Sequence, residues 1–213
     1  MNTQTSLSTQ IASALLRIEA VALRPGQPFM WTSGIKSPIY CDNRLTISYP
    51  EIRNLIADGF VAMIREQYPD VEVIAGAAMG GIPHAAWVAD KLNLPMIYVR
   101  DKAKGHGKEN LIEGILRAEQ KVVVIEDLIS TGGSSLKVAQ AVNASGGIAM
   151  CVMAIFTYQL DQATEAFFEG KIPLHTLTTY SELLEEAVRL DKIEQKDIVL
   201  MQSWRENPRA FGN

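Results

Sequence analysis

Two adjacent carboxylates, Glu126 and Asp127, stand shortly before a cluster of small residues that runs from Ser130 to Ser135. Glycines in such a cluster let the backbone approach a ligand closely, while hydroxyls and backbone N–H groups donate hydrogen bonds to an anion. Carboxylates repel a bare phosphate, but they can accept hydrogen bonds from the vicinal hydroxyls of a ribose. The combination therefore predicts a site for a sugar phosphate, with the acids on the sugar and the loop on the phosphate.

The residues on either side of this cluster predict the elements that an anion site needs. Residues 122–125 are four branched apolar residues, which is typical of a strand buried on both faces of a parallel sheet. An amphipathic run at 136–142 predicts a helix whose N-terminus faces the cluster. A strand–turn–helix connection with polar caps is the simpler alternative, but the acidic pair and the hydroxyls favour a site. The Gly-Lys-Ser/Thr of a Walker A loop and a G-x-G-x-x-G fingerprint are both missing.

A second unit of strand, glycine-rich loop and helix precedes the first. We expect the strand at 71–75, the loop at 76–81 and the helix at 82–92. In a parallel sheet both loops emerge at the carboxyl edge, where two anion-binding turns would suit a sugar with a phosphate group at each end. Tight packing of a helix on a strand would also explain these glycines.

A polar segment with four positive side chains besides His106 follows the next expected strand, at 95–99. This segment, 100–110, lacks the apolar residues that would fold it, so we expect it to be mobile. Most such runs are solvated loops. A cationic flap that closes over a pyrophosphate would instead neutralise charge and exclude water.

The stretch 122–135 resembles the phosphoribosyl-pyrophosphate (PRPP) motif of type I phosphoribosyltransferases. The N-terminal stretch 29–44 resembles the orotate phosphoribosyltransferases in particular. The cationic segment is similar to the catalytic loop of that family, and the residues that fit its pattern are Arg100, Lys104, His106 and Gly107. Many members have lysines at three positions where this chain has Thr32, Gly80 and Asp101, and Lys102 follows the last of these.

The resemblance implies an α/β fold: a mainly parallel, doubly wound sheet flanked by helices. It implies a single domain over 1–213, with a core at about 50–180 and a hood at about 1–45 that C-terminal elements complete. In the hood we expect a helix at 9–20 and a hairpin in which 29–31 pairs with 38–41. Further strands are expected at 111–114, 148–156 and 174–178, and further helices from Pro50 and at 160–169, 180–190 and 193–204.

The resemblance also implies a reaction, in which orotate and PRPP give orotidine 5′-monophosphate and pyrophosphate in pyrimidine (UMP) biosynthesis. The catalytic residues would be Asp127, Lys104, His106 and Glu126. The PRPP-binding residues would be Arg100, Lys104, His106, Glu126, Asp127, Leu128, Ile129, Ser130, Thr131, Gly132, Gly133, Ser134, Ala78, Met79 and Gly80. Ser130, Lys36 and Tyr40 would bind orotate.

Mg²⁺ is the implied cofactor, held mainly through PRPP, with Asp127 as the candidate protein ligand. The implied assembly is a homodimer in which each flap acts in the neighbouring site. Two alternatives remain open. One is a phosphoribosyltransferase for another base, and the other is a non-catalytic regulator with this fold that senses PRPP.

Composition is consistent with an enzyme of this kind. The chain has 213 residues, of which 47% are hydrophobic and 21% charged, so it can bury a full core. A net charge of −4 argues against a nucleic-acid partner. The two cysteines follow no metal or redox spacing, and no apolar run reaches membrane-spanning length. Residues 1–10 lack the apolar core of a signal peptide, so we expect a cytoplasmic protein.

Overall fold

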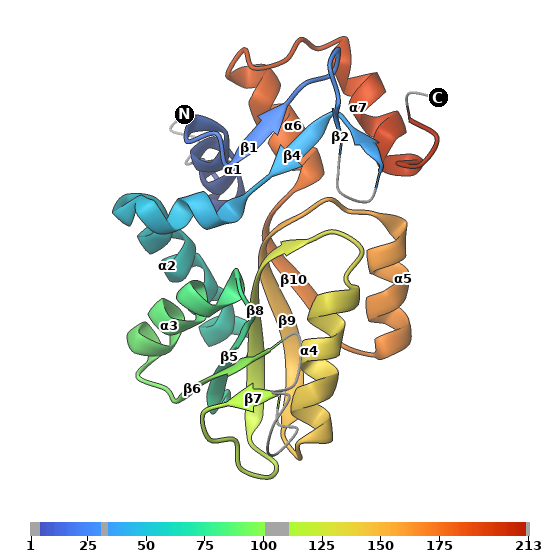
Figure 1. The fold of residues 1–213 in the computed structure, drawn as a ribbon. Coiled ribbons are helices and arrows are strands. Elements are labelled where there is room, and N and C mark those ends of the chain that lie inside the picture. Colours follow the sequence, from blue (N-terminus) through green and yellow to red (C-terminus); the bar gives the residue numbers. More distant parts are fainter. Residues whose placement is uncertain (1–4, 31–33, 101–110, 212–213) are drawn as a thin grey trace.

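A six-stranded sheet runs through the centre of the computed structural model, which describes residues 5–30, 34–100 and 111–211 (Figure 1). The strand order is β10-β9-β8-β5-β6-β7. The strands are β5 (Val73–Ala77), β6 (Met96–Val99), β7 (Ile112–Glu113), β8 (Lys121–Ile129), β9 (Ile148–Thr157) and β10 (Leu174–Thr179). All neighbours are parallel except β6 and β7. The expected mainly parallel sheet is confirmed.

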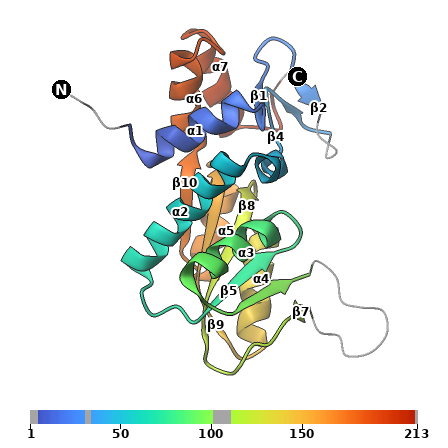
Figure 2. The ribbon, with the colours of Figure 1, turned by 90° about the vertical axis from the view of Figure 1, so that its left-hand side faces the viewer.

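Helices cover both faces of this sheet, with α2 and α3 on one face and α4 and α5 on the other (Figure 1, Figure 2). Their bounds are α2 (Pro50–Gln67), α3 (Gly81–Leu92), α4 (Gly133–Ala144) and α5 (Asp161–Gly170). Alternate side chains of β8 serve the two faces: Val123 and Ile125 cluster with Phe60 of α2, whereas Val122 and Val124 cluster with α4. The apolar run 122–125 is therefore buried on both sides, as predicted.

A hood of N-terminal and C-terminal elements lies over the carboxyl edge of the sheet (Figure 1). Its elements are α1 (Leu7–Arg17), β1 (Val21–Leu23), β2 (Phe29–Met30), β3 (Lys36–Ser37), β4 (Ile39–Cys41), α6 (Tyr180–Arg189) and α7 (Asp197–Glu206). Trp204 of α7 is fully buried and joins the two ends of the chain. Its Nε1 donates to the carbonyl of Lys36 at 3.2 Å, and its ring meets Tyr158 edge-on at 5.7 Å.

The strands of the hood pair differently from the predicted hairpin. β4 pairs antiparallel with β1, so that Cys41 lies opposite Val21, and β2 pairs with β3, so that Phe29 lies opposite Ser37. The predicted pairing of 29–31 with 38–41 is therefore wrong, and Trp31 lies outside the described residues. Strands of two or three residues carry too little alternation to define a partner, so tertiary packing decides the pairing.

The first helix lies two to three residues before its predicted bounds of 9–20. The hydroxyl of Ser6 accepts a hydrogen bond from the backbone of Thr9 at 3.1 Å and starts the helix earlier. Glu19 has a φ of 58°, which ends the helix before Ala20.

Of two further helices, one starts at the predicted residue and one starts later. α2 begins as predicted, with Pro50 at its first position and Glu51 in its first turn. The C-terminal helix α7 begins at Asp197 rather than at Ile193. Within 5–30, 34–100 and 111–211, no helix is long and apolar enough to cross a membrane.

Candidate active site

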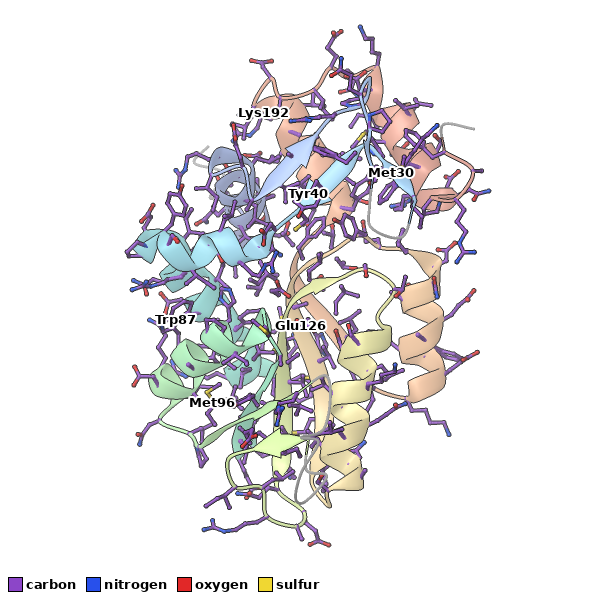
Figure 3. All side chains as sticks on the ribbon, in the orientation of Figure 1. Met30, Tyr40, Trp87, Met96, Glu126 and Lys192 are labelled. Carbon is purple, nitrogen blue, oxygen red and sulfur yellow. The ribbon has the colours of Figure 1, made fainter. Side chains whose placement is uncertain are left out.

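A pocket of about 350 Å³ opens between the hood and the carboxyl edge of the sheet. Its walls come from the hood, from the loop after β5 and from the end of β8; Figure 3 shows Glu126 below the hood residue Tyr40. The lining residues are Cys41, Asp42, Arg44, Ala78, Met79, Gly80, Glu126, Asp127, Leu128, Ser130 and Ser134. The two glycine-rich loops thus meet at one edge of the sheet, as predicted.

β8 extends beyond the apolar run 122–125 that marked the strand, through the two carboxylates to Ile129. Its pairing with β5 stops at Ile125, whereas its pairing with β9 continues to Ile129. Glu126 and Asp127 therefore lie on a strand that has just lost one neighbour. The sheet itself opens the space into which these two acids can reach.

Glu126 is almost fully buried and carries a strongly shifted pKa. Its Oε1 accepts from the backbone N–H of Asp127 at 3.0 Å, and its Oε2 accepts from the Ser135 hydroxyl at 2.9 Å. Burial, reinforced by the adjacent Asp127 carboxylate, raises the pKa of Glu126 to about 9. At neutral pH Glu126 therefore holds a proton, and it can donate as well as accept a hydrogen bond.

The carboxylate of Asp127 lies directly against the backbone of Gly80. A Cβ at position 80 would overlap the carboxyl carbon and both carboxylate oxygens of Asp127. Gly81 is equally close to β8, because a Cβ there would overlap the carbonyl oxygen of Ile125. These glycines let the 78–80 loop approach the acids closely.

A buried polar network holds the main chain of Asp127. Asn43 Nδ2 donates to the Asp127 carbonyl at 2.6 Å, and Cys41 Sγ donates to Asn43 Oδ1 at 3.2 Å. Thr46 Oγ1 donates to the Asn43 carbonyl at 2.5 Å and lies 3.3 Å from His84 Nε2. His84 is fully buried, and burial lowers its pKa to about 4, so the network carries no charge at neutral pH.

The small-residue cluster forms an open helix N-terminus. Gly132 has a φ of 79° and precedes α4, and a side chain there would crowd the ring of Phe167. Thr131, Gly133 and Ser134 are exposed. The side chain of Ile129, by contrast, is fully buried in the core, so only its backbone could meet a ligand.

Several predicted site residues lie away from the pocket lining. Arg100 pairs with Glu113 at 3.3 Å and borders a separate groove of about 610 Å³ beside α4. Lys36 lies on β3, and Tyr40, 47% exposed on β4, packs 5.7 Å from the ring of Phe29. Lys104 and His106 lie outside the described residues, as do Thr32, Asp101, Lys102 and Gly107.

Three lining residues, Cys41, Asp42 and Arg44, were not predicted as site residues. They lie in the N-terminal stretch that resembles the orotate phosphoribosyltransferases, at the end of β4 and the start of the 3-10 helix η1 (Asn43–Ser48). Arg44 Nε donates to Asp42 Oδ1 at 2.7 Å. The charged residues Asp42 and Arg44 after a short strand could have indicated a site. Their position beside Glu126 and Asp127, however, depends on how the hood packs over the sheet.

Known proteins are similar to this chain in sequence and architecture. The family model for the phosphoribosyl transferase domain matches residues 48–164. Over 208 residues the chain is 55% identical to orotate phosphoribosyltransferase of Enterococcus faecalis (strain ATCC 47077 / OG1RF), which covers 98% of this chain and 99% of that one.

Solved structures extend the comparison to the fold. The crystal structure of orotate phosphoribosyltransferase from Aeropyrum pernix matches with a TM-score of 0.73 at 27% identity, over 86% of this chain and 99% of that one. Leishmania donovani UMP synthase matches with a TM-score of 0.78 at 26% identity, over 93% of this chain and 42% of that longer one. The chain therefore belongs to the orotate phosphoribosyltransferase family.

Proposed function

We propose that the chain transfers the 5-phosphoribosyl group of PRPP to orotate, giving orotidine 5′-monophosphate (OMP) and pyrophosphate in pyrimidine biosynthesis. The observation that carries the proposal is the pocket itself, in which Glu126 and Asp127 lie between two glycine-rich loops at one edge of the sheet. Membership of the orotate phosphoribosyltransferase family supports orotate as the base.

The acids suit the ribose of PRPP. As the bond from C1 to the pyrophosphate breaks, positive charge develops on the sugar ring. Asp127, held through its main chain by Asn43, would accept a hydrogen bond from a ribose hydroxyl and stabilise that charge. Glu126, protonated at neutral pH, would bind the neighbouring hydroxyl without adding a second negative charge.

The two loops suit the two phosphate ends. The 5′-phosphate would lie at the N-terminus of α4, where the first backbone N–H groups have no hydrogen-bond partner within the helix. That site comprises Leu128, Ile129, Ser130, Thr131, Gly132, Gly133 and Ser134, with Ile129 contributing only its backbone. The pyrophosphate would lie against Ala78, Met79 and Gly80 on the other loop.

The remaining predicted residues act on the leaving group and the base. Lys104, His106 and Arg100 would stabilise the negative charge that develops on the departing pyrophosphate. Ser130, which lines the pocket, and the hood residues Lys36 and Tyr40 would contact orotate. The ring nitrogen of orotate is itself the nucleophile, so the chain needs no covalent catalyst.

The donor set of the pocket fits Mg²⁺ only if PRPP and the protein share the ion between them. Within the described ranges, no group of three or more His, Cys, Asp or Glu side chains could hold a metal ion. Glu126 keeps its proton, which leaves Asp127 as the carboxylate facing the ribose. We propose that PRPP oxygens supply most ligands and Asp127 the protein ligand, and that the ion neutralises phosphate charge.

We propose that the whole chain folds as one domain and that two copies form a homodimer whose flaps act in each other's sites. One core cluster supports a single domain, because it contains Ile11 and Ile39 of the hood, Ile125 of the sheet and Trp204 of α7. The dimer remains an expectation from the family.

A panel of bases tests the proposed substrate. With PRPP and Mg²⁺ present, orotate should be used far more efficiently than uracil, because uracil lacks the carboxylate that the site would pair. Comparable kcat/KM values for orotate and uracil would reject orotate and leave a phosphoribosyltransferase for another base. Turnover of no base, with tight PRPP binding, would favour the PRPP-sensing regulator.

A further inference from the structure

Under the proposed function, three parts of the pocket lining are taken by PRPP and one remains for the base. The loop 78–80 and the segment 128–134 would hold the two phosphate ends, and the acids of β8 the ribose hydroxyls. The remaining wall is the hood segment that contains Cys41, Asp42 and Arg44. A base that joins the ribose at C1 would therefore lie against this hood wall.

Orotate carries a carboxylate, and the acidic side chains around the pocket would repel this group. Asp42 and Asp127 are acidic, and Glu126 offers at most a neutral hydrogen bond. Arg44 is the one cationic side chain among the described residues that line the pocket. It lies on the hood wall, where the base would sit.

The guanidinium of Arg44 is oriented and still available. Its Nε donates to Asp42 Oδ1 at 2.7 Å, and its backbone N–H donates to the same oxygen at 3.3 Å. Within the described ranges, its two terminal nitrogens make no hydrogen bond, and the side chain is 62% exposed. Asp42 therefore fixes one edge of the guanidinium and leaves the other edge for a ligand.

We propose that Arg44 binds the carboxylate of orotate and selects orotate over bases that lack this group; the proposal rests on the proposed function. A planar guanidinium offers paired N–H donors that match the two oxygens of a carboxylate, which a lysine cannot do in the same way. Arg44 is then a specificity-determining residue, which contacts the base rather than the reacting bond.

Binding of the product and of its analogue without the carboxylate tests this assignment without relying on turnover. UMP differs from OMP by the missing carboxylate, so the ratio of their dissociation constants reports how well that group is recognised. Isothermal titration should show that Arg44→Gln weakens OMP binding on the order of thirtyfold, as expected when one partner of a charged pair is removed. UMP and PRPP should each bind within threefold of wild type.

The matched control is Arg53→Gln. Arg53 Nη1 donates to the carbonyl of Ile47 at 3.2 Å, so this arginine also braces η1, but it does not line the pocket. It should leave the ratio of OMP to UMP affinity unchanged. Arg44→Met keeps the apolar stem of the side chain and should weaken OMP binding as Arg44→Gln does. It replaces Arg44→Gln if that variant does not fold.

The outcomes separate the two proposals. If wild type binds OMP more tightly than UMP and the Arg44 variants keep this preference, the role of Arg44 is overturned and the proposed function stands. Equal weakening of OMP and UMP, or weakening of PRPP above threefold, also overturns it, because Arg44 would then bind phosphate or ribose. A wild-type chain that binds OMP no better than UMP would instead contradict the proposed orotate site.

Discussion

Glu126→Gln should make the folded chain more stable than wild type at alkaline pH. Burial raises the pKa of Glu126 from its ordinary 4.5 to about 9. Between these values the unfolded chain has lost a proton that the folded chain keeps. The stability that this proton provides is complete below pH 4.5 and is lost progressively as the pH rises towards 9.

The size of the effect follows from one proton. A difference of one bound proton changes the free energy of unfolding by about 1.4 kcal/mol per pH unit. Between pH 6 and pH 8, which both lie inside this window, the free energy of unfolding of wild type should fall by about 3 kcal/mol because of Glu126, whereas the Gln variant should show no such fall. Gln keeps the shape and can still accept from the backbone N–H of Asp127.

Urea unfolding at pH 6, 7 and 8, at one fixed protein concentration, measures this difference. Glu186→Gln is the matched control, because Glu186 is equally buried but hydrogen bonds from Arg189 lower its pKa. Glu186 is ionised in both states throughout this range, so its variant should shift stability equally at each pH. A difference in unfolding free energy between Glu126→Gln and wild type that stays constant from pH 6 to pH 8 would show that the folded chain does not keep this proton.

Four further outcomes can be checked by kinetics. Asp127→Asn keeps the shape of Asp127 but removes its charge, so steady-state assays should show kcat falling much more than PRPP affinity. Lys104→Ala should lower kcat on the order of a hundredfold, since removing one preorganised charge costs ~3 kcal/mol, with the circular dichroism spectrum unchanged. When these two variants are mixed and their subunits exchange, about a quarter of all sites should be wild type if each flap acts in the neighbouring subunit's site. No site should be restored if each flap acts in its own subunit. Gly80→Ala should lower kcat with little change in Tm, because its Cβ displaces the Asp127 carboxylate; unchanged kcat would contradict the contact between them.

The elements that build the centre of the site could be predicted because their sequence signals are local. The run at 122–125 is long enough to mark a buried strand, and it lies within β8. Pro50 and Glu51 marked the start of α2 for the same reason, since both act within the first turn. Both glycine-rich loops were placed at one edge because a parallel sheet leaves no other arrangement.

What could not be predicted depends on contacts between distant segments. The two- and three-residue strands of the hood take their partners from packing around Trp204, which comes far later in the chain. Asn43 reaches the carbonyl of Asp127 across 84 positions of sequence, and no local pattern marks it. Arg44 lies within the stretch 29–44 whose resemblance was recognised, but no local pattern marked it as a residue that lines the pocket.

The loss of orotate absorbance on mixing the chain with orotate, PRPP and Mg²⁺ is the decisive test of the proposed reaction. We expect the absorbance to fall only when all components are present, and one pyrophosphate to appear for each orotate consumed. Asp127→Asn, assayed in parallel, should slow the reaction. Unchanged orotate absorbance with folded wild-type chain at saturating PRPP and Mg²⁺ would contradict the assignment of this pocket as an orotate phosphoribosyltransferase site.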